Sequence, residues 1–194
     1  EIVIGTKDGM LIKFNETDIR SMGRVAGGVR GIRLRKGDIA VGMDVVHEGK
    51  EILVVTEKGF GKRTSQEEYR IQSRGGYGLK TLNVTERNGS LVAMKAVDGS
   101  EDLMLITIHG ILIRMDISDI SVIGRSTQGV RLIRLGEDEL VATVAKVAKD
   151  EDEENSIDED SDTIVESQMN EEDDSSIDET DSSIEEENGN DEEK

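Results

Sequence analysis

The chain has 194 residues and a formal net charge of −19, with 43 acidic against 24 basic residues and no Cys, Pro or Trp. The absence of Cys excludes a disulfide framework and thiolate chemistry, and the absence of Pro excludes polyproline ligands and rigid Pro linkers. No apolar run is long enough to span a membrane and no signal peptide opens the sequence, so we predict a cytoplasmic protein without a membrane partner.

A unit of about 50 residues occurs three times in the first 149 residues. Its clearest stretches recur at 1–9, 51–59 and 102–110, and again at 28–32, 78–82 and 129–133. A period of this length is typical of propeller blades. We place three blades at about 1–50, 51–101 and 102–149. Because propellers typically close with about four to eight blades, and residue 1 is not Met, we expect the C-terminal half of a larger domain.

Each unit contains four short runs rich in Val, Ile, Leu and Thr, separated by Gly, Asn or Asp. In the second unit the runs cover 51–56, 60–64, 78–84 and 91–97. Runs of this length and composition predict strands, with a hairpin loop at 57–59 and one helical turn within 65–76. The fold class predicted is all-β, a propeller-like array of three four-stranded blades.

The aromatic residues align with aliphatic residues of the other units. Phe60 corresponds to Met10 and Ile111, and Tyr69 corresponds to Ile19 and Ile120. We therefore predict that Phe60 and Tyr69 belong to the core and are not platforms for stacking bases.

Basic residues recur at equivalent positions of successive units, and we group them into four basic sets. The first set is Lys13, Arg63 and Arg114; the second is Arg24, Arg74 and Arg125; the third is Arg30, Lys80 and Arg131; and the fourth is Arg20 with Arg70. In a radial array, equivalent positions lie along one arc, so the sets predict a basic rim that binds the phosphates of double-stranded DNA. The alternative is that these residues only solvate Gly-rich loops.

Nothing in the sequence predicts catalysis. The only histidines, His47 and His109, lack metal-ligand spacing, and there is no nucleophile paired with a base. The stretch 59–64 lacks the spacing of a phosphate-binding loop. We predict no catalytic residue, metal or cofactor in this part of the protein.

The acidity is confined to the end of the chain. Residues 150–194 hold 23 of the 43 acids and a single base, Lys194, for a net charge of −22, whereas residues 1–149 have a net charge of +3. Such a composition predicts disorder. Two interpretations stay open: a solubilising polyanion, or a tethered polyanion that competes with DNA for the basic rim.

Residues 72–78 (Gln-Ser-Arg-Gly-Gly-Tyr-Gly) and 124–135 (Gly-Arg-Ser-Thr-Gln-Gly-Val-Arg-Leu-Ile-Arg-Leu), within this repeat, resemble the C-terminal β-pinwheel domain of the bacterial DNA gyrase A subunit. The resemblance covers 1–149. It implies the last three blades of a six-bladed domain that exchanges strands between neighbouring blades and wraps DNA. It also implies an A2B2 complex with the gyrase B subunit, in which the parent enzyme uses ATP and Mg to supercoil DNA.

One departure matters. The family's wrapping motif has bases where this sequence has Ser73 and Tyr77, so 72–78 resembles a degenerate copy and the true motif is expected upstream. The catalytic tyrosine of the family is also expected upstream and is neither Tyr69 nor Tyr77. Two alternatives stay open: the pinwheel of the topoisomerase IV A subunit, and a protein-binding propeller of the chromosome-condensation-regulator type.

Overall fold

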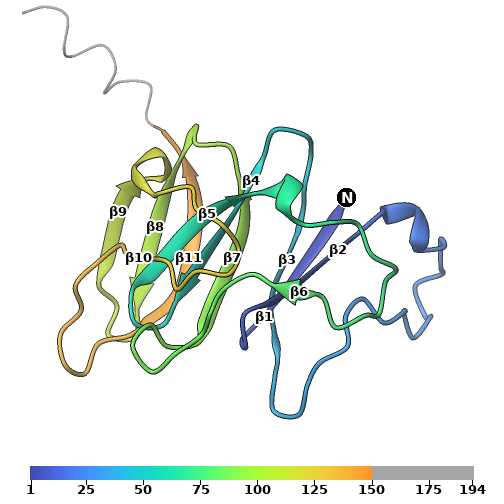
Figure 1. The fold of residues 1–194 in the computed structure, drawn as a ribbon, viewed down its shortest axis with the longest axis horizontal. Helices are drawn as coiled ribbons and strands as arrows, with labels where there is room; N and C mark the ends of the chain where they lie inside the picture. Colours follow the sequence, from blue (N-terminus) through green and yellow to red (C-terminus); the bar gives the residue numbers. More distant parts are fainter. Residues whose placement is uncertain (150–194) are drawn as a thin grey trace, which may run out of the picture. The chain divides into compact units, whose positions relative to one another are not determined.

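Three antiparallel sheets follow one another along the chain in the computed structural model, which describes residues 1–149 (Figure 1). The strands are β1 (Ile2–Thr6), β2 (Met10–Phe14), β3 (Ala40–Val45), β4 (Glu51–Thr56), β5 (Phe60–Ser65), β6 (Leu79–Lys80), β7 (Leu91–Val97), β8 (Glu101–Thr107), β9 (Leu112–Asp116), β10 (Val130–Arg131) and β11 (Val141–Ala148). Three 3-10 turns, η1 (Glu16–Asp18), η2 (Gln66–Glu68) and η3 (Ile117–Asp119), follow β2, β5 and β9. The predicted all-β, propeller-like fold is confirmed, whereas the predicted disorder of 150–194 lies outside the described residues.

The hairpin that opens each unit is closed by one threonine and one glycine. In the β4–β5 hairpin, the Gly59 N–H donates to the Thr56 carbonyl at 3.1 Å and the Phe60 N–H donates to Thr56 Oγ1 at 3.3 Å. Gly59 has φ of +74°, which only glycine adopts without strain. The predicted hairpin loop at 57–59 and the predicted helical turn, observed as η2, are both confirmed.

The third run of each unit does not join its own sheet. The sheet orders are β3-β1-β2-β6, β10-β5-β4-β7 and β11-β8-β9. Strand β6 of the second unit thus pairs with β2 of the first, and β10 of the third unit pairs with β5 of the second. The strand exchange that the resemblance implied is therefore present at both junctions between units. Among residues 1–149, the third sheet has three strands and 28–32 forms none.

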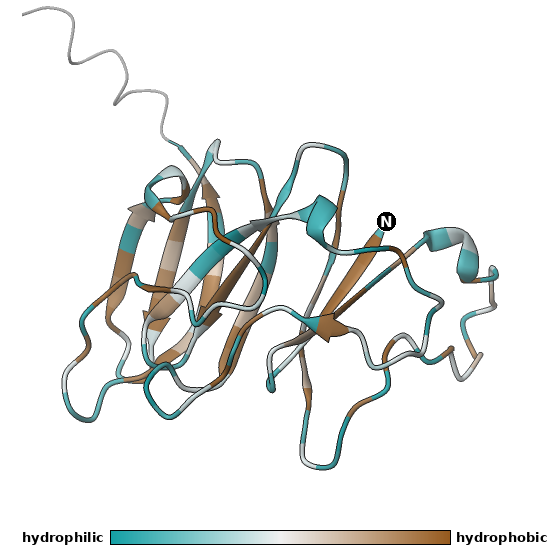
Figure 2. Ribbon diagram, viewed as in Figure 1, coloured by the Kyte–Doolittle hydropathy of each residue, from teal (hydrophilic) through white to brown (hydrophobic). Residues whose placement is uncertain are grey.

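The sheets stack face to face, and the central strand β4 supplies both layers of core. Ile52 and Val54 belong to the cluster shared with the first sheet, whereas Leu53 and Val55 belong to the cluster shared with the third. Successive residues of a strand point to opposite faces, so a strand buried on both faces is apolar throughout. Figure 2 shows the brown, apolar residues concentrated on the strands and the teal, polar residues on loops and 3-10 turns.

Both aromatic residues assigned to the core are buried. Phe60 is 5% exposed and Tyr69 is 1% exposed, and the Tyr69 hydroxyl lies 2.6 Å from Thr81 Oγ1. Burial raises the pKa of the Tyr69 phenol. The prediction for these two residues is confirmed. Among residues 1–149, no helix is long and apolar enough to cross a membrane.

Candidate nucleic-acid interface

The first basic set pairs with carboxylates inside the sheets. Each partner stands at the equivalent place in its unit: Glu51 on β4, Asp102 on β8, and Glu1 directly before β1. Lys13 Nζ lies 3.0 Å from Glu1 Oε2, Arg63 Nη1 lies 2.8 Å from Glu51 Oε2, and Arg114 Nε lies 2.6 Å from Asp102 Oδ2. The recurrence of a base at this position is therefore matched by the recurrence of an acid, which the alignment of bases alone did not reveal.

Two members of this set also reach into the following unit. Lys13 Nζ donates to the carbonyl and the side-chain oxygen of Gln66, at 3.0 and 2.8 Å. Arg63 donates from Nε to the Ile120 carbonyl at 2.7 Å and from Nη2 to the Ser118 carbonyl at 2.9 Å. Lys13 is only 5% exposed. The cations of Lys13 and Arg63 thus satisfy protein oxygens between units, and the assignment of these two residues to DNA binding stays a prediction.

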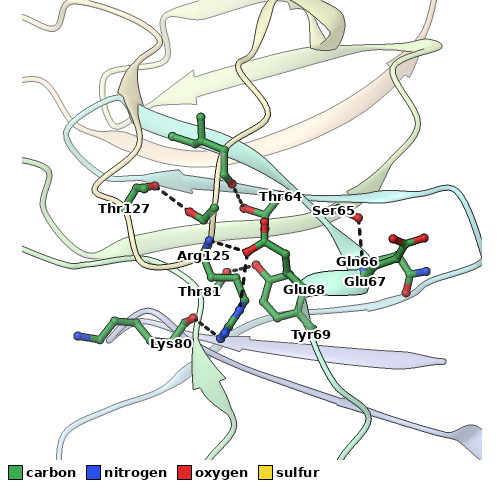
Figure 3. Close-up of polar contacts among 12 residues, drawn as sticks. Thr64, Ser65, Gln66, Glu67, Glu68, Tyr69, Lys80, Thr81, Arg125 and Thr127 are labelled. Carbon is green, nitrogen blue, oxygen red and sulfur yellow. Dashed lines mark hydrogen bonds and ion pairs between the residues drawn. The ribbon is translucent and has the colours of Figure 1, made fainter.

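The second basic set holds the third in place. Arg74 Nη1 donates to the Arg30 carbonyl at 3.0 Å, and Arg125 Nη1 donates to the Lys80 carbonyl at 3.3 Å. Figure 3 shows Arg125 beside Glu68, whose Oε2 accepts the Arg125 backbone N–H at 3.1 Å, and close to Lys80. Arg74 and Arg125 are both half-buried. Their guanidiniums therefore hold the backbone of the third-set residues in place as well as contributing positive charge. Arg24, the first-unit member, is exposed and makes no hydrogen bond or ion pair within residues 1–149.

The third and fourth basic sets are the exposed ones. All five side chains are exposed, and within residues 1–149 none of them forms an ion pair: Arg30, Lys80, Arg131, Arg20 and Arg70. Lys80 lies on β6 opposite Met10, and Arg131 lies on β10 opposite Phe60, so the exchange places both at the same register of successive sheets. This is the repeated outward presentation of charge that the rim hypothesis requires.

The sequence reasoning missed a basic cluster in the first unit. Arg33, Arg35 and Lys36 are exposed, and the Arg33 guanidinium lies 5.4 Å from the centroid of the Tyr77 ring. They follow Arg30 within a few residues, so a simple count of bases along 30–36 would have found them. They were overlooked because only Arg33 has a basic equivalent in another unit, which is Arg134 of the third.

A second omission is a buried lysine. Lys62 is 0% exposed, and its Nζ donates to the carbonyls of Gly124 and Arg125 at 2.6 and 2.7 Å and to Thr127 Oγ1 at 3.0 Å. Burial lowers the pKa of Lys62 to about 8. Lys62 thereby fixes the loop that carries Arg125. Alternation along β5 is the signal that could have found it, since it places Lys62 on the same face as the buried Thr64.

The described residues show no metal site. No group of His, Asp and Glu within 1–149 could hold a metal ion. His109 lies in an exposed turn with Nδ1 2.8 Å from Glu139 Oε2, and His47 is exposed. The exposed polar groups that recur in this arrangement are basic side chains, which suits a binding surface.

Comparison with known proteins agrees with this geometry. The family model described as the DNA gyrase C-terminal domain, beta-propeller, matches residues 1–47, 50–98 and 101–148. The DNA gyrase A subunit of Staphylococcus aureus (strain MRSA252) is 55% identical over 157 residues, which are 80% of this chain and 18% of that protein. The corresponding protein from strain NCTC 8325 is 53% identical over 167 residues, 85% of this chain and 19% of that protein. The chain thus spans about a fifth of the length of these relatives.

Solved structures share the fold. A DNA gyrase A C-terminal domain aligns with a TM-score of 0.70 and 26% identity, covering 75% of this chain and 50% of that one. The C-terminal domain of a DNA topoisomerase IV aligns with a TM-score of 0.71 and 23% identity, covering 76% of this chain and 46% of that one. At that identity the topoisomerase IV likeness shows the fold alone.

Proposed function

We propose that this chain, which belongs to the DNA gyrase C-terminal domain family, binds double-stranded DNA along its third and fourth basic sets. The observation that carries the proposal is the equivalent, exposed placement of Lys80 and Arg131 on exchanged strands. Lysine and arginine side chains without acidic partners on a protein surface attract phosphates, whatever the base sequence.

The expected mode of binding is contact with the phosphate backbone. Phe60 and Tyr69 are buried, so they offer no ring to stack on an unpaired base, and the exposed ring of Tyr77 already lies against the Arg33 guanidinium. A duplex that touches equivalent positions on successive sheets must bend, and base sequence would enter through the deformability of the DNA. The module we propose therefore wraps DNA with weak sequence preference and a steep dependence on salt.

The proposal extends to the parent protein. The relatives named above are gyrase A subunits, and the chain corresponds to less than a fifth of their length. We propose that this module serves a cytoplasmic A2B2 complex with the gyrase B subunit, in which ATP and Mg act elsewhere to drive negative supercoiling. The module itself is non-catalytic in this proposal. The topoisomerase IV alternative has weaker sequence support, and family membership disfavours a protein-binding propeller.

The test is a salt titration of duplex binding by the full chain. Replacing Lys80 and Arg131 by Gln should weaken binding and reduce the slope of log affinity against log salt by about two, close to one for each lost phosphate contact. The matched control replaces Lys50 and Lys149 by Gln. Lys50 directly precedes β4 and Lys149 directly follows β11, away from the hairpin ends where Lys80 and Arg131 lie, so this variant should keep the slope. An equal loss of slope in both variants would mean that net charge, and not this surface, binds DNA.

The acidic residues of 150–194 supply a second test. With a net charge of −22, this segment should compete with DNA for the basic sets. Replacing its acids by Asn and Gln at unchanged length should tighten duplex binding, most strongly at low salt where charges are least screened. Equal affinity of the two chains at low salt would leave the segment a solubilising role only.

A further inference from the structure

A cavity of about 380 Å³ opens where the second and third units meet, beside the exchanged strand β10. Its wall includes Phe60 at the start of β5 and the segment that follows β10. The charged residues of the wall are Lys58, Arg87, Arg131, Arg134, Glu137 and Glu139. Four bases therefore face two carboxylates in a space large enough for part of a small ligand.

Two guanidiniums are held over one aromatic ring. The guanidinium carbon of Arg131 lies 5.3 Å from the centroid of the Phe60 ring, and that of Arg87 lies 5.6 Å from it. Contact with the face of a ring attracts a cation and orients its plane. Phe60 is 5% exposed, so the ring is fixed by the core while the cations above it are exposed.

The donors of this cluster are unused. Within residues 1–149, the guanidiniums of Arg87, Arg131 and Arg134 make no hydrogen bond or ion pair. Glu139 is already engaged, with Oε2 2.8 Å from His109 Nδ1. Lys58 Nζ donates to the Glu86 carbonyl, which anchors the amine and leaves its charge in place. The cavity thus has an excess of positive charge and several N–H groups without an acceptor in the described part of the chain, the features that bind a phosphate.

The first junction between units lacks this arrangement. By repeat register, Asp8 stands in place of Lys58, Met10 in place of Phe60 and Asn83 in place of Arg134. Arg87 itself lies in a connection before β7 that is one residue longer than those before β3 and β11. The basic cavity is therefore a feature of the second junction and not a by-product of the repeat.

We propose that this cavity, the Arg87–Arg131–Arg134 pocket, binds a phosphate group. Arg131 belongs both to the pocket and to the third basic set, so a duplex that follows that set passes the mouth of the pocket. The pocket then receives a backbone phosphate, and Arg87 and Arg134 add donors to the contact of Arg131. This inference rests on the proposed DNA-binding function only in naming DNA as the source of the phosphate. That the pocket binds a phosphate group is argued from its own residues.

The experiment uses the full chain and two probes, a linear DNA duplex and inorganic phosphate. The test variant is Arg87→Gln with Arg134→Gln, and the matched control is Lys50→Gln with Lys149→Gln, which removes equal charge elsewhere. We expect the test variant to lower the salt slope of duplex binding by about two while the control keeps it. We also expect phosphate to shift the side-chain Nε–H resonances of Arg87 and Arg131 in the unmodified chain.

A third variant, Phe60→Leu, tests the support beneath the guanidiniums. Leucine resembles the aliphatic Met10 and Ile111 of the other units, so the core should be kept while the cation–π contacts are lost. We expect duplex affinity to fall a few-fold, with near-ultraviolet and amide spectra that still report a folded chain. Unchanged affinity in this folded variant would contradict the role of the ring.

The outcomes separate the two proposals. If the Arg87 and Arg134 variant binds duplex like the unmodified chain while the Lys80 and Arg131 variant is weakened, the pocket is refuted and the DNA-binding function stands. If the unmodified chain fails to bind duplex but phosphate shifts the arginine resonances, the function is refuted and the pocket binds a free phosphate ester. If neither probe acts on the pocket, the inference is wrong.

Discussion

The two junctions between successive units share a backbone design and differ in their buried charges. At both, a two-residue strand crosses to the preceding sheet, and an arginine, Arg74 or Arg125, bonds the carbonyl of the preceding unit's third-set residue. At the first junction the buried cation is Lys13, which has Glu1 as a partner. The second adds Lys62, whose hydrogen-bond partners among residues 1–149 are carbonyl and hydroxyl oxygens. The two junctions thus share the same backbone pairing because the unit is repeated. They differ in their buried charges because single residues differ between the units.

The shared design depends on close backbone approach at one glycine per junction. Gly78 and Gly129 begin the exchanged segments with φ of +76° and +78°. A Cβ at Gly78 would lie 2.5 Å from the Leu11 carbonyl oxygen, and one at Gly129 would lie 2.8 Å from the Gly61 carbonyl oxygen. Both contacts are with backbone atoms of the accepting strand, which cannot move aside without breaking the sheet.

Gly78→Ala should produce the largest loss of stability among the changes considered. The positive φ costs about 1–2 kcal/mol for a residue with Cβ, and the overlap with β2 adds about 1–3 kcal/mol. Denaturant unfolding of the full chain should show a lower midpoint, with Gly129→Ala close behind. The Met10–Lys80 register should also loosen, which amide hydrogen exchange at Thr81 would report.

The control for this prediction lies in the first unit. Gly28 is the equivalent glycine, with φ of +77°, but nothing lies within 4 Å of the position that its Cβ would occupy. Gly28→Ala should therefore lower the free energy of unfolding only by the cost of the positive φ, about 1–2 kcal/mol. Equal losses at Gly28 and Gly78 would show that the close approach in the exchanged strand contributes nothing to stability.

The sequence predicted the repeat, the strands and the hairpins because those depend on local pattern. It did not predict the pairing of β6 with β2 from the residues themselves. A strand of two residues has no readable alternation, and its partner lies a full unit away along the chain. Only the family resemblance suggested the exchange, and only the structure shows which residues pair.

The basic sets show a similar limit. Repeat register found four sets of recurring bases, missed the equivalent pair Arg33 and Arg134, and could not tell which side chains face outward. Every residue of β2 is buried, so alternation does not separate the two faces around Lys13. The partners that hold Lys13 and Arg63 inward, such as Gln66 and Ser118, belong to the next unit. The burial of a repeated base thus depends partly on contacts between units, which the pattern within one unit does not show.

The buried cation of the second junction makes a prediction about pH. An unfolded lysine has a pKa near the ordinary value of 10.5, whereas burial lowers the pKa of Lys62 in the folded chain to about 8. Between these values the unfolded chain binds more protons than the folded one. Stability therefore rises with pH through this window, and below pH 8 the folded chain carries the full desolvation penalty of the charged amine.

The expected contribution of Lys62 to the free energy of unfolding is a gain of about 2 kcal/mol between pH 8 and pH 10. Lys62→Met and Lys62→Gln should both remove this rise, whatever they do to stability at pH 7, because neither side chain titrates. Denaturant unfolding of the three chains at pH 8, 9 and 10 measures the difference in slope. A rise that persists in both variants would place its origin in groups other than Lys62. The positions equivalent to Lys62 in the other units are Ile12 and Ile113. A rise that disappears in both variants would therefore show that this one lysine makes the stability of the second junction sensitive to pH.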